Sequence, residues 1–157
     1  MNTVTNVKFA GLGGQGILTC TDILGRVVFD LGFDVKKAEV HGMSQRGGAI
    51  TSDLRFGKKV LSPMISAGCA DFLIVLGDDQ IDANQHFLKP DGVLIKPSDF
   101  PADQLENKRT LNVALLGALS PHMDFTVEQW MTAIHQQLPE RLHAVNERAF
   151  MLGRGEK

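Results

Sequence analysis

The chain has 157 residues, of which 43% are hydrophobic and 22% charged, and its net charge at pH 7 is −2. This length suits one domain, the composition excludes intrinsic disorder, and the slight acidity argues against a nucleic-acid-binding surface. No run of about 18 apolar residues occurs, which argues against a membrane span. The first residues, Met1–Asn6, lack the charged and then apolar pattern of a secretion signal. We therefore expect a cytoplasmic protein without nucleic-acid or membrane partners.

The two cysteines, Cys20 and Cys69, are far apart in the sequence and form no Cys-x-x-Cys pair. A four-cysteine iron–sulfur cluster or zinc site needs more thiolates than this chain has. Four histidines on expected helices or loops show no metal-ligand spacing; they are His86, His122, His135 and His143. We therefore expect no metal site and no complete catalytic set within this chain alone.

Apolar runs alternate with helical patterns in the first half of the chain, which predicts a parallel α/β sheet. The expected strands are Val7–Ala10, Phe33–Val40 and Ala49–Phe56. Between the first two strands, apolar residues recur at helical spacing, which predicts a helix over 15–31 that Gly32 ends. After the third strand, Gly57-Lys58 turns the chain towards Val60-Leu61, which indicates a hairpin.

The second half predicts strands over 71–76 and 93–95, with a short helix over 79–87 and a turn at 90–92 between them. Three helices follow: an apolar one over 112–119, one that Thr126 and Gln129 cap, and a last one that ends at Gly153. These elements predict an α/β fold and a single domain of residues 1–153. Its sheet is mostly parallel with one hairpin, its C-terminal helices pack on the sheet, and residues 154–157 form a frayed tail.

A glycine loop follows the first strand and opens the first helix. Gly11, Gly13 and Gly16 match the pattern G-x-G-x-x-G, and Gly14 and Gln15 lie between them. Such a turn lets backbone N–H groups approach an anion, and the helix N-terminus adds a partial positive charge. A dinucleotide site also needs an acidic residue at the end of the second strand, for which Glu39 is the candidate. The alternative is that the glycines only allow close packing of strand and helix.

A second polar loop follows the second expected strand. Its residues are His41, Gly42, Met43, Ser44, Gln45, Arg46, Gly47 and Gly48. If the first two strands are parallel neighbours, this loop lies beside the glycine loop at the carboxyl edge of the sheet. Arg46 then offers a fixed guanidinium fork to a carboxylate or phosphate. The alternative is a solvated turn whose arginine pairs with a nearby acid.

Together the two loops resemble those of a known family. The 11–16 loop and the 39–48 block closely resemble the gamma subunit, or gamma domain, of 2-oxoacid:ferredoxin oxidoreductases, most of all the form called the beta subunit in indolepyruvate ferredoxin oxidoreductase. Further matching stretches span nearly the whole chain; they are Leu54-Arg55-Phe56-Gly57, Ser62-Pro63, Ala70-Asp71, Leu88-Lys89-Pro90-Asp91-Gly92, Asn112-Val113-Ala114-Leu115-Leu116-Gly117-Ala118-Leu119 and Asn146-Glu147-Arg148-Ala149-Phe150. The glycine loop alone is a weak signal, and the 39–48 block is far more specific.

The resemblance implies a single Rossmann-like, three-layer α/β domain that is an accessory part of a larger enzyme. In that family, thiamine diphosphate with its Mg²⁺ attacks the 2-oxoacid in other subunits, iron–sulfur clusters pass electrons to ferredoxin, and coenzyme A accepts the acyl group. This chain lacks the Gly-Asp-Gly…Asn pattern that holds the thiamine diphosphate metal, because Gly77-Asp78-Asp79 is not followed by it. We expect the chain to hold no cofactor alone and to complete the active site from one side, with coenzyme A as a candidate ligand at the interface.

The implied partners are thiamine-binding and iron–sulfur subunits, ferredoxin indirectly, and a second copy of this chain when it is isolated. Two segments depart from the family pattern: Gly77-Asp78-Asp79-Gln80 differs from it, and the segment 97–110 is shorter. Two other functions stay open at this point. One is a free-standing NAD(P)-binding oxidoreductase, and the other is a non-catalytic interaction module.

Overall fold

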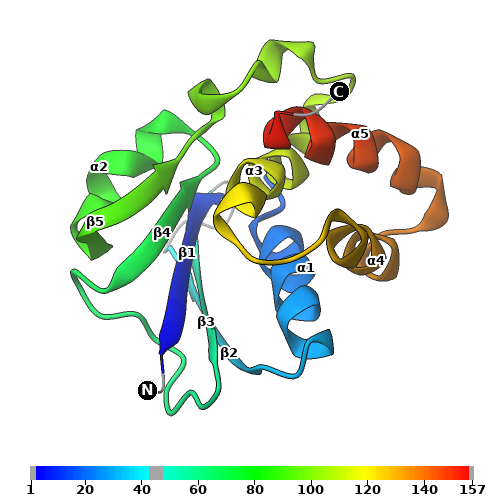
Figure 1. Cartoon of the computed structure of the whole chain (residues 1–157). Coiled ribbons are helices and arrows are strands. Elements are labelled where there is room, and N and C mark those ends of the chain that lie inside the picture. Colours follow the sequence, from blue (N-terminus) through cyan, green and yellow to red (C-terminus); the bar gives the residue numbers. More distant parts are fainter. Residues whose placement is uncertain (1–2, 43–47, 156–157) are drawn as a thin grey trace.

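The computed structural model describes residues 3–42 and 48–155, which form a five-stranded sheet covered by helices (Figure 1). The strands are β1 (Val4–Leu12), β2 (Asp34–His41), β3 (Ala49–Gly57), β4 (Ala70–Val75) and β5 (Leu88–Ile95). The α-helices are α1 (Ile17–Asp30), α2 (Ile81–Asn84), α3 (Leu111–Leu119), α4 (Val127–Gln137) and α5 (His143–Arg154). The α/β class and the single three-layer domain expected from the sequence are confirmed.

The strand order is β2-β3-β1-β4-β5, and the sheet is mixed. β1, β4 and β5 run parallel to one another, whereas β3 is antiparallel to both β1 and β2. The expectation that the first two strands are direct neighbours is therefore wrong, because β3 lies between them. β1 and β2 still point the same way, so their carboxyl ends, Leu12 and His41, reach the same edge of the sheet.

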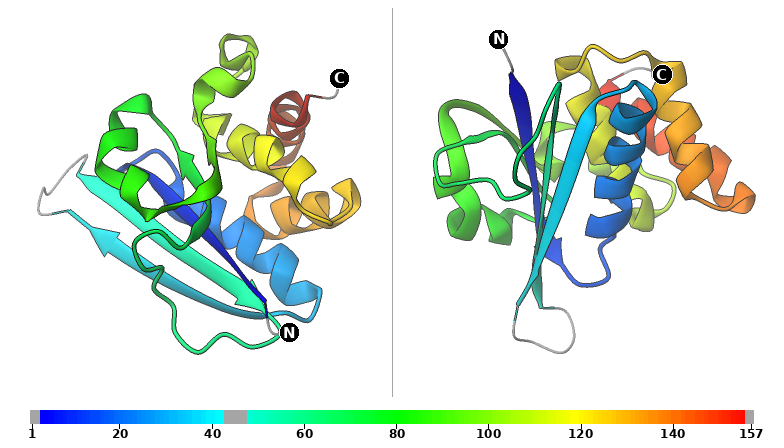
Figure 2. Two further views of the ribbon diagram at one scale, coloured as in Figure 1. Left: turned by 60° about the vertical axis from the view of Figure 1, so that its left-hand side comes forward. Right: turned by 90° about the horizontal axis from the view of Figure 1, so that it is seen from below.

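The hairpin of this sheet is formed by β2 and β3, not by the chain after Gly57 as expected. Residues 58–69 form no strand and cross the face of the sheet opposite the four long helices (Figure 2). Side chains from the sheet hold this crossover. Asp53 accepts from the N–H of Ile65 at 2.9 Å, and Arg55 donates to the carbonyl of Ser62 at 2.7 Å. These bonds satisfy backbone groups of the crossover, which therefore needs no partner strand.

Alternation along β1 explains the two layers that cover the sheet. Val7 and Phe9 are fully buried against the layer of α1, α3, α4 and α5, whereas Ala10 packs on the other face with Leu73 and Val75. Lys8 also points to that second face, where its ammonium pairs with Asp53 at 2.8 Å. Period-two alternation in a strand covered on both sides produces this pattern.

Helices α3 and α5 cross very closely, and glycines make this crossing possible. A Cβ at Gly117 would collide with the carbonyl of Phe150, and a Cβ at Gly153 would collide with the carbonyl of Ala114. The expectation that the last helix ends at Gly153 is therefore wrong, because Gly153 lies inside α5. The helix continues to Arg154, which donates to the hydroxyl of Ser120 at 2.8 Å, so Arg154 is not part of a frayed tail.

The turn expected at 90–92 is a bulge inside β5. Leu88 pairs with Ala70 and Val93 pairs with Phe72, so four residues of β5 stand opposite a single residue of β4. A bulge of this kind bends an edge strand and interrupts its pairing. The short helix expected over 79–87 consists of α2 flanked by two single 3-10 turns, Asp78–Gln80 and Gln85–Phe87.

Candidate functional site

The glycine loop ends β1 and turns sharply into α1. Gly14 and Gly16 have φ angles of +89° and +83°, a left-handed conformation that side chains other than glycine adopt with strain. The side chain of Gln15 folds back over the turn, because its Oε1 accepts from the N–H of Leu12 at 2.7 Å. The N–H of Gln15 in turn donates to the carbonyl of Leu12 at 3.2 Å. The loop is thus closed by its own glutamine.

Asn112, at the start of α3, anchors this loop to the helical layer. Its Nδ2 donates to the carbonyl of Gly16 at 3.1 Å, and its own carbonyl lies 3.6 Å from the Sγ of Cys20. Asn112 is only 6% exposed. Cys20 is buried beside it, and this burial raises the pKa of its thiol, which therefore stays protonated at neutral pH. Sequence reasoning missed Asn112, although a polar residue inside an apolar helical run was the available signal.

The two loops meet at the carboxyl edge of the sheet. The N–H of Gly13 donates to the carbonyl of Gly48 at 2.9 Å, and the N–H of Gly42 donates to the carbonyl of Ala49 at 2.7 Å. The antiparallel pairing of Leu12 with Ala49 brings them together, since β3 starts where β1 ends. The candidate residues between these points lie outside the described residues; they are Met43, Ser44, Gln45, Arg46 and Gly47. What this surface binds stays a prediction.

Glu39 is not placed as a dinucleotide site requires. It lies on β2, two strands from β1, and two strand spacings amount to about 10 Å. Its carboxylate pairs with Lys37 at 3.2 Å and with His41 at 3.6 Å. Burial alone would lower the pKa of Lys37, but its hydrogen bonds to Asp22 and Glu39 outweigh that effect and raise the pKa. Glu39 therefore belongs to a chain of surface ion pairs. Its position does not support the hypothesis that it binds the ribose of a dinucleotide.

Acidic residues follow β4 at the same edge of the sheet. The N–H of Leu76 donates to the carbonyl of Ala10 at 2.9 Å, which keeps the segment after β4 beside the end of β1. Asp78 and Asp79 come directly afterwards, and Asp78 lines a hollow of about 490 Å³ together with Asp103. These carboxylates make this part of the edge unfavourable for an anionic ligand. Sequence reasoning noted residues 77–80 as a departure from the family pattern and found that they do not begin a thiamine diphosphate metal motif, but it assigned these carboxylates no role at this edge.

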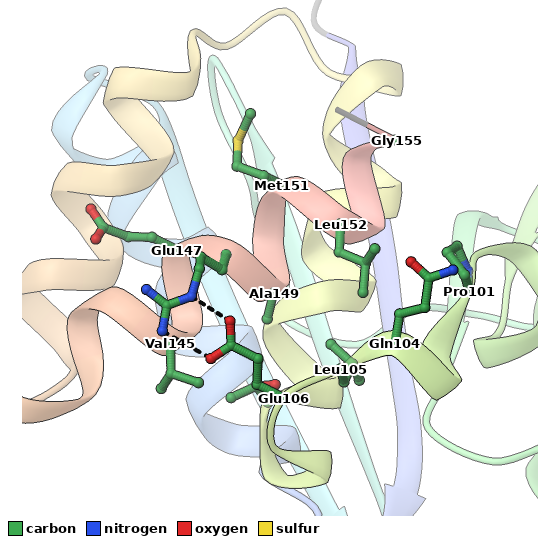
Figure 3. A pocket seen from close by; sticks show the side chains of 12 residues that line it. Pro101, Gln104, Leu105, Glu106, Val145, Glu147, Ala149, Met151, Leu152 and Gly155 are labelled. Carbon is green, nitrogen blue, oxygen red and sulfur yellow. Dashed lines mark hydrogen bonds and ion pairs between the residues drawn. The ribbon is translucent and has the colours of Figure 1, made fainter. Parts of the chain in front are cut away.

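A larger hollow of about 720 Å³ lies between the segment 101–106 and α5 (Figure 3). Leu105, Ala149 and Leu152 give it apolar walls. At its rim Arg148 grips Glu106 through two hydrogen bonds of 2.6 and 2.9 Å, which lower the pKa of Glu106 and raise that of Arg148. Sequence reasoning assigned no role to these residues, and Glu106 and Arg148 are already paired with each other.

Among residues 3–42 and 48–155, no three His, Cys, Asp or Glu side chains come together as metal ligands. No helix in the same residues is long and apolar enough to cross a membrane.

The protein is thus a single α/β domain with a mixed sheet. Its glycine loop is hydrogen-bonded to Gly48, just before β3, at the carboxyl edge of that sheet. The chain belongs to the pyruvate ferredoxin/flavodoxin oxidoreductase family, whose model matches residues 6–156. It is 32% identical to the indolepyruvate oxidoreductase subunit IorB of Thermococcus kodakarensis, over 94% of this chain and 93% of that protein. That alignment spans 190 positions, more than this chain has residues, so the relative contains segments that this chain lacks.

Solved structures share the fold. The gamma subunit of a keto/oxoacid ferredoxin oxidoreductase from Geobacter sulfurreducens has a TM-score of 0.80 and 22% identity, with 98% of this chain and 96% of that chain covered. A 2-oxoglutarate:ferredoxin oxidoreductase from Magnetococcus marinus, solved with 2-oxoglutarate, coenzyme A and succinyl-CoA bound, has a TM-score of 0.84 and 18% identity. The match covers 99% of this chain and 31% of that chain, so there the fold is one part of a longer polypeptide.

Proposed function

We propose that this protein is the accessory, gamma-type subunit of a thiamine-diphosphate- and ferredoxin-dependent 2-oxoacid oxidoreductase, working in the cytoplasm. Its family membership and its full-length similarity to an indolepyruvate oxidoreductase subunit support this role. In this proposal the chain alone has no activity, and thiamine diphosphate, Mg²⁺ and iron–sulfur clusters are held by partner chains. The oxidation of a 2-oxoacid such as indolepyruvate or pyruvate is then an activity of the complex.

The observation that carries the proposal is the hydrogen bond from Gly13 to Gly48. It joins two glycine-rich segments into one backbone-rich surface at the carboxyl edge of the sheet, where ligands bind in open α/β folds. Three N–H groups of the glycine loop, those of Leu12, Gly13 and Gln15, already have partners inside the protein. Because these N–H groups are already bonded, the loop is better suited to contact another protein chain than to bind a pyrophosphate by itself.

The chain's own contribution is to position groups and exclude water. Glycines at a docking surface let a partner's backbone or cofactor approach closely. Arg46 supplies the charge that meets an acidic group there, a carboxylate of the partner chain or a phosphate of coenzyme A at the interface. Excluding water from such an interface strengthens each of these polar contacts. Coenzyme A is the acyl acceptor of the reaction, and here the chain contributes binding surface only.

The test is reconstitution of the complex from the full chain and its thiamine-binding partner. We expect neither chain alone to reduce ferredoxin with a 2-oxoacid, and the mixture to do so. Arg46→Ala lowers the activity of the complex at least tenfold, whereas Arg141→Ala, a change at an exposed arginine between α4 and α5, leaves it unchanged. Full activity of the Arg46→Ala complex contradicts the assigned surface, and failure of the two chains to associate contradicts the subunit role.

The competing dinucleotide function is tested on the isolated chain. Nicotinamide binding, followed by NADH fluorescence, is expected to be absent, since Glu39 is held by Lys37 and lies two strands from the glycine loop. Saturable binding that Gly13→Val abolishes would favour the free-standing oxidoreductase instead.

A further inference from the structure

Strand β2 is an edge strand with an open outer side. It runs from Asp34 to His41, and among the described residues it pairs only with β3. Figure 2 shows it as the outermost strand on its side of the sheet. Its carboxyl half is exposed, and Val40 is 52% exposed. An open edge of this length offers a row of N–H and C=O groups to another strand unless charges or bulges block it.

The side chains of β2 alternate between two faces of the sheet. Val35, Lys37, Glu39 and His41 share one face, because Val35 packs on the core beneath α1 and Lys37 bonds to Asp22 of α1 at 2.6 Å. Lys36, Ala38 and Val40 occupy the opposite face by the two-residue period of a strand. Lys37 and Glu39 already pair within the strand at 3.2 Å. The exposed edge thus has a cation and an anion two residues apart, with a small residue between them.

We propose that β2 pairs antiparallel with β2 of a second copy of this chain, about a two-fold axis that passes through Ala38. A two-fold axis perpendicular to the sheet keeps each face on its own side, so only registers centred on a residue are possible. With Ala38 opposite Ala38, Lys37 of each copy faces Glu39 of the other. Together with the pairs inside each strand, this makes a ring of four alternating charges.

The neighbouring registers are opposed by the same charges. Centring on Lys37 sets Lys37 against Lys37, and centring on Glu39 sets Glu39 against Glu39. Like charges directly opposite each other destabilise a strand pair. Lysine on an edge strand ordinarily discourages pairing, but here the copy itself supplies the complementary anion. The pattern therefore selects one register and one partner.

The pairing is compatible with the proposed docking surface and is independent of it. Antiparallel pairing places the carboxyl ends of the two β2 strands at opposite ends of the joined sheet, so Gly42 and Gly48 of one copy lie at the opposite end from those of the other. A complex with two copies of each chain then has two separate docking surfaces. Loss of the dimer would not remove the glycine-loop contact between Gly13 and Gly48.

Charge reversal tests the register on the full chain. Sedimentation equilibrium is expected to give a dimer for the natural sequence and to show at least tenfold weaker association for Lys37→Glu and for Glu39→Lys. The double variant Lys37→Glu/Glu39→Lys restores alternating charges across the axis and regains the dimer. Asp22→Asn is the matched control, since it removes the bond of Asp22 to Lys37 within the chain and leaves the cross-strand charges unchanged. A monomeric natural chain, or a double variant no better than the single ones, overturns the proposal.

Cross-linking provides a second test that does not depend on charge. In a Cys69→Ser background, which removes the exposed cysteine, Ala38→Cys is expected to form a disulfide-linked dimer on mild oxidation, because the two residues face each other on the axis. Lys36→Cys in the same background is off the axis and is expected to cross-link at least tenfold more slowly. Equal rates for both variants, or cross-linking of Ala38→Cys to a thiamine-binding chain and not to itself, overturns the proposal. Circular dichroism of each variant verifies that it is folded.

Discussion

The side-chain amide of Asn112 donates a hydrogen bond to the backbone carbonyl of Gly16, with 3.1 Å between nitrogen and oxygen. The two residues lie 96 positions apart in the sequence and join the start of α3 to the end of the glycine loop. The same carbonyl accepts from the N–H of Cys20 at 3.1 Å, so it is shared between α1 and α3. The shape of the glycine loop therefore depends on the helical layer as well as on its own glycines.

Gly16→Ala is expected to destabilise the protein more than Gly14→Ala. Both positions have positive φ angles, which cost a residue with a Cβ about 1–2 kcal/mol. At Gly14 no atom lies within 4 Å of the added Cβ, whereas at Gly16 the Cβ collides with the amide of Asn112. Urea unfolding measures the two free energies of unfolding. Equal losses at both positions would show that Asn112 does not constrain the loop.

The close crossing of α3 and α5 is expected to tolerate no side chain at Gly153. Gly153→Ala inserts a methyl group against the carbonyl of Ala114, and relieving this overlap requires the two helices to separate. We expect a loss of about 3 kcal/mol or more in the free energy of unfolding, at the upper end for overpacking. Gly155→Ala is the control, because a Cβ there meets no atom within 4 Å and costs only the strain of φ +89°. A loss at position 153 no larger than at position 155 contradicts the crossing geometry.

Lys8 and Asp53 form a buried ion pair, since both residues are 4% exposed and Nζ lies 2.8 Å from Oδ1. The ammonium also stands 3.8 Å above the centre of the Phe87 ring. Lys8→Met leaves the carboxylate of Asp53 buried without its cation, and we expect a loss of about 3–5 kcal/mol in the free energy of unfolding. The double variant Lys8→Met/Asp53→Asn is expected to recover part of this loss. Urea unfolding measures the free energy of unfolding of the natural chain and the two variants. No recovery in the double variant would argue against direct coupling between Lys8 and Asp53.

Asp34 gives the stability a defined pH dependence. The N–H of Val60 donates to its carboxylate at 2.7 Å, and this hydrogen bond, with help from Lys36, lowers the pKa of Asp34. A lowered folded-state pKa contributes stability above the unfolded-state pKa, and this contribution is lost as the pH falls through the folded-state pKa. The difference in unfolding free energy between the natural chain and Asp34→Ala is therefore expected to be larger at pH 7 than at pH 3. A difference that stays constant over this range would contradict the assignment.

Local signals in the sequence predicted the elements of this fold well. Thr126 and Gln129 form the expected capping box, in which the N–H of Gln129 donates to Thr126 Oγ1 at 3.1 Å and the N–H of Thr126 to Gln129 Oε1 at 2.8 Å. Gly32, with φ +88°, follows the end of α1 as expected. Such features depend on a few adjacent residues, which explains why they can be predicted without knowledge of the tertiary structure.

Long-range arrangements could not be predicted in the same way. Nothing local in β3 indicates that it inserts between β1 and β2, since strand order is decided by packing over the whole chain. The same limit applies to Gly153, for which the local pattern predicted a helix end. In the structure a glycine is needed there because a Cβ would collide with Ala114 of α3. In the candidate site, the meeting of the two loops was expected, but Asn112 was not. Its role depends on Gly16, which is distant in the sequence.

In the function that we propose, residues 12–16 and 42–48 form the surface on which a thiamine-binding chain docks. Backbone amide hydrogen exchange of the full chain, with and without that partner, shows which segments the partner covers. We expect complex formation to slow exchange in peptides covering these two segments and to leave exchange in the peptides of α4 unchanged. Unchanged exchange in both segments, with new protection elsewhere on the chain, would contradict it.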